Sequence, residues 1–239
     1  AGDPDLASTE ELLIVLANSG ATLIELGVPF SDPMADGPVI QRASERALKH
    51  SFGLPEILDT VARARKQIDI PIILFSYYNP LLQFGLKRVG KAAKEAGLDG
   101  VLVTDLTPEE SVEFETELRA NGLDMIFLIA PTSTDERLKL VAQRASGFVY
   151  AVSRAGVTGA QSNVSAEAEK LVNRMRRFSE LPIAVGFGIS NAEQVSDVNR
   201  YADGVVVGSA IVAEMERIGR GPELAEGIRK FLTGLQDFS

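Results

Sequence analysis

The most constraining feature of this chain is a repeated pairing of a short apolar run with a segment of helical periodicity. The apolar runs are continuous rather than alternating, which is typical of parallel strands covered by helices on both faces. This repetition predicts an α/β fold built from successive βα units. Strands are expected at Thr22–Leu26, Ile70–Ser76, Gly100–Thr104, Met125–Ile129, Phe148–Val152, Ile183–Gly186 and Gly204–Val207.

Helices are expected between these strands, and several carry start or stop signals. Thr107-Pro108 is predicted to begin one helix, and Gly97 and Gly122 to end two others. The long interval between the first two strands has room for two helices and a loop. Helices are expected at Thr9–Ser19, Leu54–Gln67, Leu86–Ala96, Glu109–Asn121, Asp135–Arg144, Ala166–Phe178 and Asn191–Tyr201.

Length and composition narrow the class of protein. The 239 residues suit one α/β barrel, which commonly has about 250 residues, although two small domains also fit. No linker-like stretch divides the sequence, so we expect one domain over residues 1–239. The chain has no Cys and one His, which excludes disulfides, thiolate metal sites and a multi-histidine metal site.

Net charge and hydropathy indicate which partners and which compartment to expect. The formal net charge is −9 and no Lys/Arg tract is present, which argues against a nucleic-acid partner. No apolar run approaches the roughly 20 residues of a membrane span, and the first residues do not resemble a signal peptide. The cytoplasm is therefore the expected compartment.

Two carboxylates are candidate acid–base groups. Glu25 interrupts an apolar strand, where burial would raise its pKa and let it exchange protons near neutral pH. The alternative is a structural Glu paired with an Arg or Lys. Asp36 lies in the Pro-rich loop after that strand, where turn formation is the alternative role. Together they put two carboxyl groups at the carboxyl end of one strand, the face that carries chemistry in α/β barrels.

Glycine turns after the last two strands indicate a phosphate site. Gly188 follows one strand, and Gly208 and Ser209 follow the other. Phosphate sites in α/β barrels are commonly built there, although glycines also simply end strands. The loop 153–160 is expected to be a lid, with Gly159 as a further backbone donor and Arg154 as a phosphate clamp or a solvated charge. A loop with no role is the alternative.

Aromatic residues at strand ends are candidate walls for a planar apolar ligand. They are Phe75, Tyr77, Tyr150 and Phe187, and core packing is the alternative for each. Asp105 is a third acid or a helix cap, and His50 is expected to be solvated.

Several motifs give the chain a family resemblance. The segment from Glu25 to Pro38 (ELGVPFSDPMADGP) closely resembles the signature of the tryptophan synthase α subunit family. Met34, where that family usually has Leu, is a mild departure. Further matches occur in order along essentially the whole chain, namely AGDPD at the start, YYNP from Tyr77, SRAGVTG from residue 153, GFGIS from Gly186 and GSAIV from Gly208.

The resemblance implies a (βα)8 TIM barrel that cleaves indole-3-glycerol phosphate to indole and glyceraldehyde 3-phosphate by a retro-aldol reaction. It assigns Glu25 as the acid/base and Asp36 as the acceptor of the ring N–H, with Thr158 closing the lid onto Asp36. The implied indole pocket consists of Phe75, Tyr77, Ile129, Tyr150 and Phe187. The implied phosphate site consists of Gly159, Gly188, Gly208 and Ser209.

The resemblance also implies a partner and no cofactor. The family acts in an αββα complex whose β subunit holds pyridoxal phosphate. Alternatives are a stand-alone lyase that releases indole, another phosphate-binding barrel isomerase or epimerase, and a regulatory subunit. Only seven strands are expected, and the family's first strand precedes the Ala1 position. We therefore expect either about 20–30 further residues before Ala1 or an impaired barrel.

Overall fold

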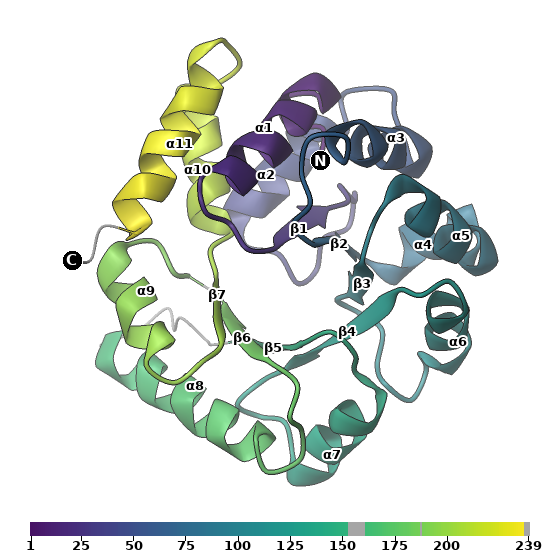
Figure 1. Cartoon of the computed structure of the whole chain (residues 1–239), viewed down its shortest axis with the longest axis vertical. Helices are drawn as coiled ribbons and strands as arrows, with labels where there is room; N and C mark the ends of the chain where they lie inside the picture. The colour runs from purple at the N-terminus through teal and green to yellow at the C-terminus, as the bar shows by residue number, and fades with distance from the viewer. Residues whose placement is uncertain (153–160, 187, 237–239) are drawn as a thin grey trace. The chain divides into compact units, whose positions relative to one another are not determined.

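The computed structural model describes residues 1–152, 161–186 and 188–236, with the backbone alone for residues 161–165. By its internal contacts the chain divides into two compact units. The first consists of residues 1–125 and 212–233, and the second of residues 126–211 and 234–239. Each unit is built from parallel strands alternating with helices (Figure 1). The expectation of a single domain remains a prediction.

The first unit carries three parallel strands in chain order, β1 (Ile24–Gly27), β2 (Ile72–Ser76) and β3 (Gly100–Val103). Side chains of paired residues in parallel strands point to the same face of the sheet. In this register Glu25 pairs with Ile73 and Gly27 pairs with Phe75. Glu25 and Phe75 therefore share one face.

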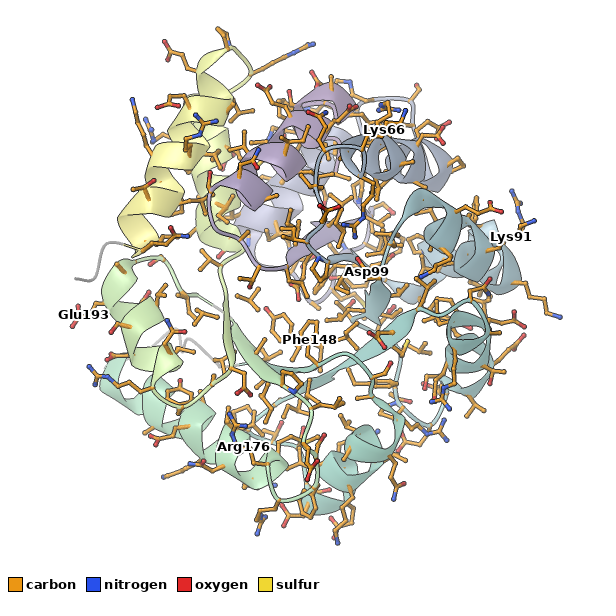
Figure 2. The ribbon with its side chains drawn as sticks, in the orientation of Figure 1. Lys66, Lys91, Asp99, Phe148, Arg176 and Glu193 are labelled. Carbon is orange, nitrogen blue, oxygen red and sulfur yellow. The ribbon has the colours of Figure 1, made fainter. Side chains whose placement is uncertain are left out.

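A carboxylate fixes the beginning of β2. Asp99, which lies just before β3 (Figure 2), accepts a hydrogen bond from the backbone N–H of Ile72 at 2.9 Å and is ion-paired with Arg65. Asp99 thus sets the register of β2 against β3 at their amino-terminal ends.

Several helices of the first unit bury an apolar stripe. In α5 the buried positions recur at helical spacing, and the helix ends at Gly97, whose φ of +88° is the left-handed conformation that favours glycine. The helices are α1 (Leu6–Asn18), α2 (Pro38–Ala47), α3 (Leu54–Ala64), α4 (Tyr78–Phe84), α5 (Leu86–Ala96) and α6 (Val112–Ala120), with most of α10 (Ser209–Ile218) and α11 (Glu223–Gln236).

An ion-pair network holds α2, the helix that follows the loop containing Asp36. Arg46 on α2 binds Asp3 and Glu216, each at 2.7 Å, and Arg42 binds Glu216 at 2.7 Å. The hydrogen bond from Arg42 is the main reason that the pKa of Glu216 falls to about 2. The network fixes α2 against α10 and against the segment before α1.

The second unit carries four parallel strands in chain order, β4 (Asp124–Ile129), β5 (Val149–Val152), β6 (Ile183–Gly186) and β7 (Gly204–Val206). The first two residues of β4 belong to the first unit. Its helices are α7 (Asp135–Arg144), α8 (Gln161–Met175) and α9 (Ala192–Asn199).

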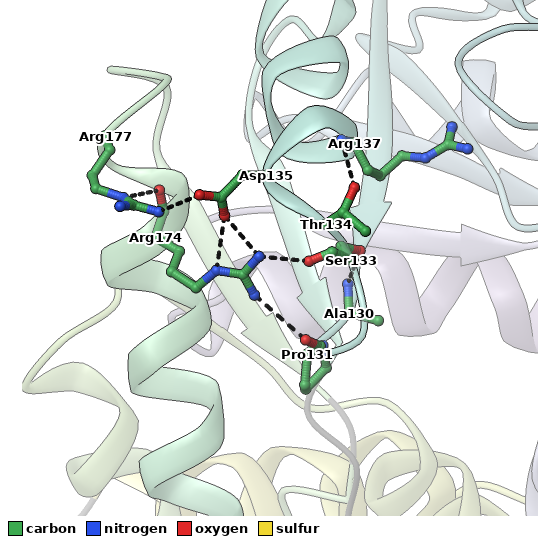
Figure 3. A network of polar contacts seen from close by, with 8 residues as sticks. All are labelled: Ala130, Pro131, Ser133, Thr134, Asp135, Arg137, Arg174 and Arg177. Carbon is green, nitrogen blue, oxygen red and sulfur yellow. Dashed lines mark hydrogen bonds and ion pairs between the residues drawn. The ribbon is translucent and has the colours of Figure 1, made fainter.

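A guanidinium group holds the segment between β4 and α7 (Figure 3). Arg174, near the end of α8, donates to the carbonyl oxygen of Ser133 at 2.7 Å and to Asp135 at 2.8 Å. Arg177 also contacts Asp135, and the hydrogen bond from Arg174 is the main reason that the pKa of Asp135 is lowered. The segment that follows Ile129 is therefore tied to α8.

The strand predictions are confirmed to within two residues at each end, and seven strands lie in the described residues. The prediction that Thr107-Pro108 begins a helix is wrong. Residues 107–110 form a turn in which the N–H of Glu110 donates a hydrogen bond to the carbonyl of Thr107. Helix α6 begins only at Val112. Helices α4, α10 and α11 have no counterpart among the expected segments, and α2 occupies the space for a second helix expected between the first two strands. Within the described residues, none of the helices has the length and apolar character needed to cross a membrane.

Candidate active site

Glu25 lies in β1 with a buried carboxyl group. Its Oε1 atom has no hydrogen-bond partner among the described residues, so the structural role of a Glu paired with Arg or Lys is not observed in that part of the chain. Burial raises the pKa of Glu25 to about 8 because the charged form loses its hydration. Glu25 is therefore mostly protonated at neutral pH and can both donate and accept a proton.

The raised pKa of Glu25 makes folding stability depend on pH. Between the ordinary carboxyl pKa and about 8, the folded protein binds a proton that the unfolded chain does not bind. The free energy of unfolding therefore falls as pH rises through this window, by at most about 1.4 kcal/mol per pH unit. Glu25→Gln should remove this decline and leave the variant more stable than wild type above pH 8.

Urea unfolding at a series of pH values measures this difference. The exposed Glu95 on α5, which makes only an i,i+4 ion pair, supplies the control Glu95→Gln. Equal slopes for Glu25→Gln and wild type would contradict the shifted pKa.

Space lies beside Glu25 on the same face of the sheet. The next residue on that face is Gly27, and a methyl group built there would have no neighbour within 4 Å among the described residues. Phe75, the partner of Gly27 in β2, is half-buried. The two strands thus present an acid, an open position and an aromatic ring on one face.

Asp36 ends the loop between β1 and α2. This loop is not helical, as predicted, and Pro38 is the first residue of α2. Asp36 is half-buried, and its N–H donates to the carbonyl of Pro33 at 3.2 Å. Burial raises the pKa of Asp36, and a hydrogen bond from Tyr77 opposes that rise.

Tyr77 connects the end of β2 to the Asp36 loop. Its hydroxyl donates to Oδ2 of Asp36 at 3.1 Å and accepts from the N–H of Ala35 at 2.9 Å. The ring is 3% exposed and contacts Phe30, with ring centroids 5.2 Å apart. Burial is the main cause that raises the pKa of Tyr77 to about 12, so the hydroxyl stays a donor. The sequence predicted Tyr77 as a pocket wall, but not this contact with Asp36.

Tyr77→Phe should destabilise the ionised form of Asp36. Without the hydroxyl, the pKa of Asp36 rises further and the acidic limb of kcat/KM moves to higher pH. We expect kcat to fall about tenfold, since one hydrogen bond to a charged group is lost. The pH profile of product formation measures both effects, and the adjacent Tyr78→Phe is the matched control. An unchanged acidic limb would show that Tyr77 does not act on Asp36.

The second unit places Tyr150 on one face of β5. Tyr150 pairs with Leu128 of β4 and Ala184 of β6, so these three side chains share a face. Ile129 pairs with Ala151 and lies on the other face, where it is 1% exposed. The structure therefore brings Leu128, not Ile129, beside Tyr150. The pairing of β4 with β5 would have identified Leu128, because the residue opposite Tyr150 in the register shares its face.

Gly186 lies under the Tyr150 ring. A methyl group at Gly186 would stand 2.2 Å from the hydroxyl oxygen of Tyr150 and 2.9 Å from Cβ of Val206. The first glycine of the GFGIS motif thus permits close packing between β5, β6 and β7.

The described phosphate candidates lie after β6 and β7. Gly188 is exposed with a φ of +74°, and Ser209 is the exposed first residue of α10. Gly208 has open space around its Cα, since an added methyl group would meet nothing within 4 Å. Arg154, Thr158, Gly159 and Phe187 lie outside the described residues. Within the described part of the chain, no three His, Asp or Glu side chains are grouped so as to hold a metal ion.

Parallel βα units with a protonatable carboxyl group on a strand define an acid–base enzyme of the α/β class. The family model described as "Tryptophan synthase alpha chain" matches residues 1–236. The chain belongs to the tryptophan synthase alpha chain family, and this confirms the resemblance seen in the sequence. Its members are lyases that cleave indole-3-glycerol phosphate.

Individual relatives agree with this assignment. The tryptophan synthase alpha chain of Geobacter sulfurreducens is 52% identical over 237 residues, covering 99% of this chain and 89% of the relative. One similar solved structure concerns the mutual activation of the tryptophan synthase a2b2 complex from Pyrococcus furiosus. Its TM-score is 0.91 at 42% sequence identity, and the match covers 100% of this chain and 95% of that chain. Aminoacrylate-bound tryptophan synthase from M. tuberculosis has a TM-score of 0.87 at 33% identity, covering 99% and 89%. The predicted TIM-barrel fold class is confirmed by these matches.

Proposed function

We propose that Glu25 and Asp36 carry out the cleavage of indole-3-glycerol phosphate in this chain. The observation that carries the proposal is the buried carboxyl group of Glu25 on β1, whose Oε1 atom has no hydrogen-bond partner among the described residues and whose pKa is about 8. The reaction breaks a carbon–carbon bond between the indole ring and the glycerol phosphate side chain. It needs a proton delivered to the ring and a proton removed from a hydroxyl group.

Glu25 supplies both proton transfers. Its protonated form donates to C3 of the indole ring, which converts the ring to an indolenine-like cation. The resulting carboxylate then accepts the proton of the side-chain hydroxyl as the carbon–carbon bond breaks and the aldehyde forms. Glu25 ends the cycle protonated, so that no net proton is consumed. A pKa near the working pH suits a group with both tasks.

Asp36 stabilises the positive charge that develops on the ring. Its carboxylate accepts a hydrogen bond from the ring N–H, and this interaction strengthens as the indolenine forms. The hydrogen bond from Tyr77 favours the ionised form that this role needs. The family resemblance assigns Thr158 and Arg154, which lie outside the described residues, to a lid loop.

The remaining site residues bind the two ends of the substrate. In the first unit, Phe75 and Tyr77 are the proposed contacts of the indole ring. In the second unit, Tyr150 is proposed for the same role, together with Leu128, which shares its face. Ile129 and Phe187 remain predicted members of the indole pocket. The phosphate binds to backbone N–H groups at glycine turns and at the start of α10, where the helix dipole favours an anion. These positions are Gly159, Gly188, Gly208 and Ser209.

The partner is a tryptophan synthase β subunit. The structural relatives from Pyrococcus furiosus are described as members of an a2b2 complex, which supports the αββα assembly for this chain. Acid–base groups of the chain suffice for the proposed steps, so the α reaction needs no cofactor or metal, and pyridoxal phosphate belongs to the β subunit. The cytoplasm is the compartment we expect.

Indole release from indole-3-glycerol phosphate, titrated with a β subunit, tests the proposal. We expect measurable turnover by the chain alone and a large increase with the β subunit. Turnover that does not respond to the β subunit would indicate a stand-alone lyase. No indole release under either condition would reject the proposed function in favour of another phosphate-binding barrel enzyme.

A further inference from the structure

Asp105 fixes the turn that carries Tyr77. It follows β3, where the N–H of Thr104 donates to the carbonyl of Ser76 at 3.0 Å and continues the pairing with β2. The Asp105 carboxylate then accepts a hydrogen bond from the backbone N–H of Tyr78 at 2.7 Å. Asp105 is thus bound to the chain one residue beyond Tyr77, although 27 positions separate it from Tyr78.

The turn held by Asp105 determines where the Tyr77 hydroxyl lies. Tyr77 has an extended backbone just before α4, and its carbonyl accepts from the Ser76 hydroxyl at 2.8 Å. Its side chain then reaches Asp36 through a hydrogen bond of 3.1 Å. That distance lies just beyond the usual range of about 2.5–3.0 Å for O–H···O hydrogen bonds, so a small displacement of the turn would break the bond.

We propose that Asp105 is a positioning residue for Asp36, acting through the turn 76–78 and the hydroxyl of Tyr77. The proposal rests on the proposed function, because it concerns the carboxylate that stabilises charge on the indole ring. Asp105 contributes as a hydrogen-bond acceptor at a fixed place and does not touch the reacting atoms. When that acceptor is removed, the N–H of Tyr78 loses its bond and the turn gains freedom to shift Tyr77 away from Asp36.

Asp105→Ala should lower kcat for indole release about fivefold with little change in KM, since misplacing a group that acts in the transition state slows the chemical step. Asp105→Asn keeps an acceptor oxygen at the same place and should restore most of kcat. Should Asp105→Ala fail to fold, Asp105→Glu moves the acceptor by one methylene and should give the same loss. The matched control is Glu56→Ala, which removes a side-chain acceptor from the backbone N–H of Gly53 at the start of α3, away from β2.

A double-mutant cycle with Tyr77→Phe identifies the route. If Asp105 acts through the Tyr77 hydroxyl, Asp105→Ala should cause no further loss of kcat in the Tyr77→Phe background. An equal loss in both backgrounds, or an equal loss from Glu56→Ala per folded molecule, would overturn the inference. So would wild-type kcat in Asp105→Ala. These outcomes leave the proposed function intact provided that Glu25→Gln and Asp36→Asn show their large losses of kcat, whereas near wild-type kcat in those two variants rejects the function itself.

Discussion

Glu25→Gln is expected to lower kcat for indole release by roughly a thousandfold, because the amide can neither give nor take the proton on which both steps depend. Gln is close to Glu in size, and no hydrogen bond of the described residues holds Oε1. Folding and substrate binding should therefore be retained. Indole formation under saturating substrate measures kcat, and binding of a substrate analogue measures the retained affinity.

The pH profile gives this expectation a second readout. In the wild type, kcat/KM should decline above an apparent pKa of about 8, where free Glu25 loses the proton that it must donate. The residual rate of Glu25→Gln should show no such limb. Glu95→Gln, on the exposed side of α5, should behave as wild type. A Glu25→Gln variant that keeps a tenth of the wild-type activity would exclude the acid/base role.

Asp36→Asn is expected to lower kcat by about two to three orders of magnitude while KM changes little. Asn still offers an oxygen to the Tyr77 hydroxyl and to the ring N–H, but it lacks the negative charge that opposes the developing cation. The loss therefore falls on the transition state and not on the bound substrate. Steady-state kinetics of indole release separate the two parameters.

A neighbouring aspartate provides the matched control for Asp36. Asp32 lies in the same loop and is exposed, and its carboxylate accepts a hydrogen bond from Ser31 at 2.5 Å. Asp32→Asn should leave kcat unchanged. If Asp36→Asn raised KM and left kcat intact, Asp36 would contribute uniform binding and not transition-state stabilisation.

The elements that the sequence predicted well are those determined by local pattern. Continuous apolar runs located the strands, and a single carboxylate inside such a run identified Glu25 as a buried acid. The left-handed glycine at Gly97 marked the end of α5. By contrast, α6 begins after a separate turn, because the Thr107 and Glu110 backbones bond to one another before the helix starts. Pro and acidic residues are equally common in turns and in the first turn of helices.

The contacts that the sequence did not predict join distant segments. Tyr77 and Asp36 are separated by 41 positions, and no local pattern indicates that the hydroxyl reaches the loop. The pairing of Leu128 with Tyr150 depends on strand register, and a shift by one residue moves every side chain to the other face. Family resemblance identified the segment that contributes to the pocket, whereas the register indicates which of its residues shares the face of Tyr150.

The close approach of Tyr150 to Gly186 has a consequence for sequence change among relatives. Any side chain at Gly186 would collide with the tyrosine hydroxyl from one strand and with Val206 from the other. Shortening Tyr150 to Phe would remove the contact at 2.2 Å, but the ring carbon Cζ would still lie 2.8 Å from the added methyl group and collide with it. A lineage could therefore replace this glycine only after both neighbours had become smaller. Each of those earlier changes would leave a gap in the packing while the glycine remained, so the three positions form an epistatic unit in which no single substitution is neutral.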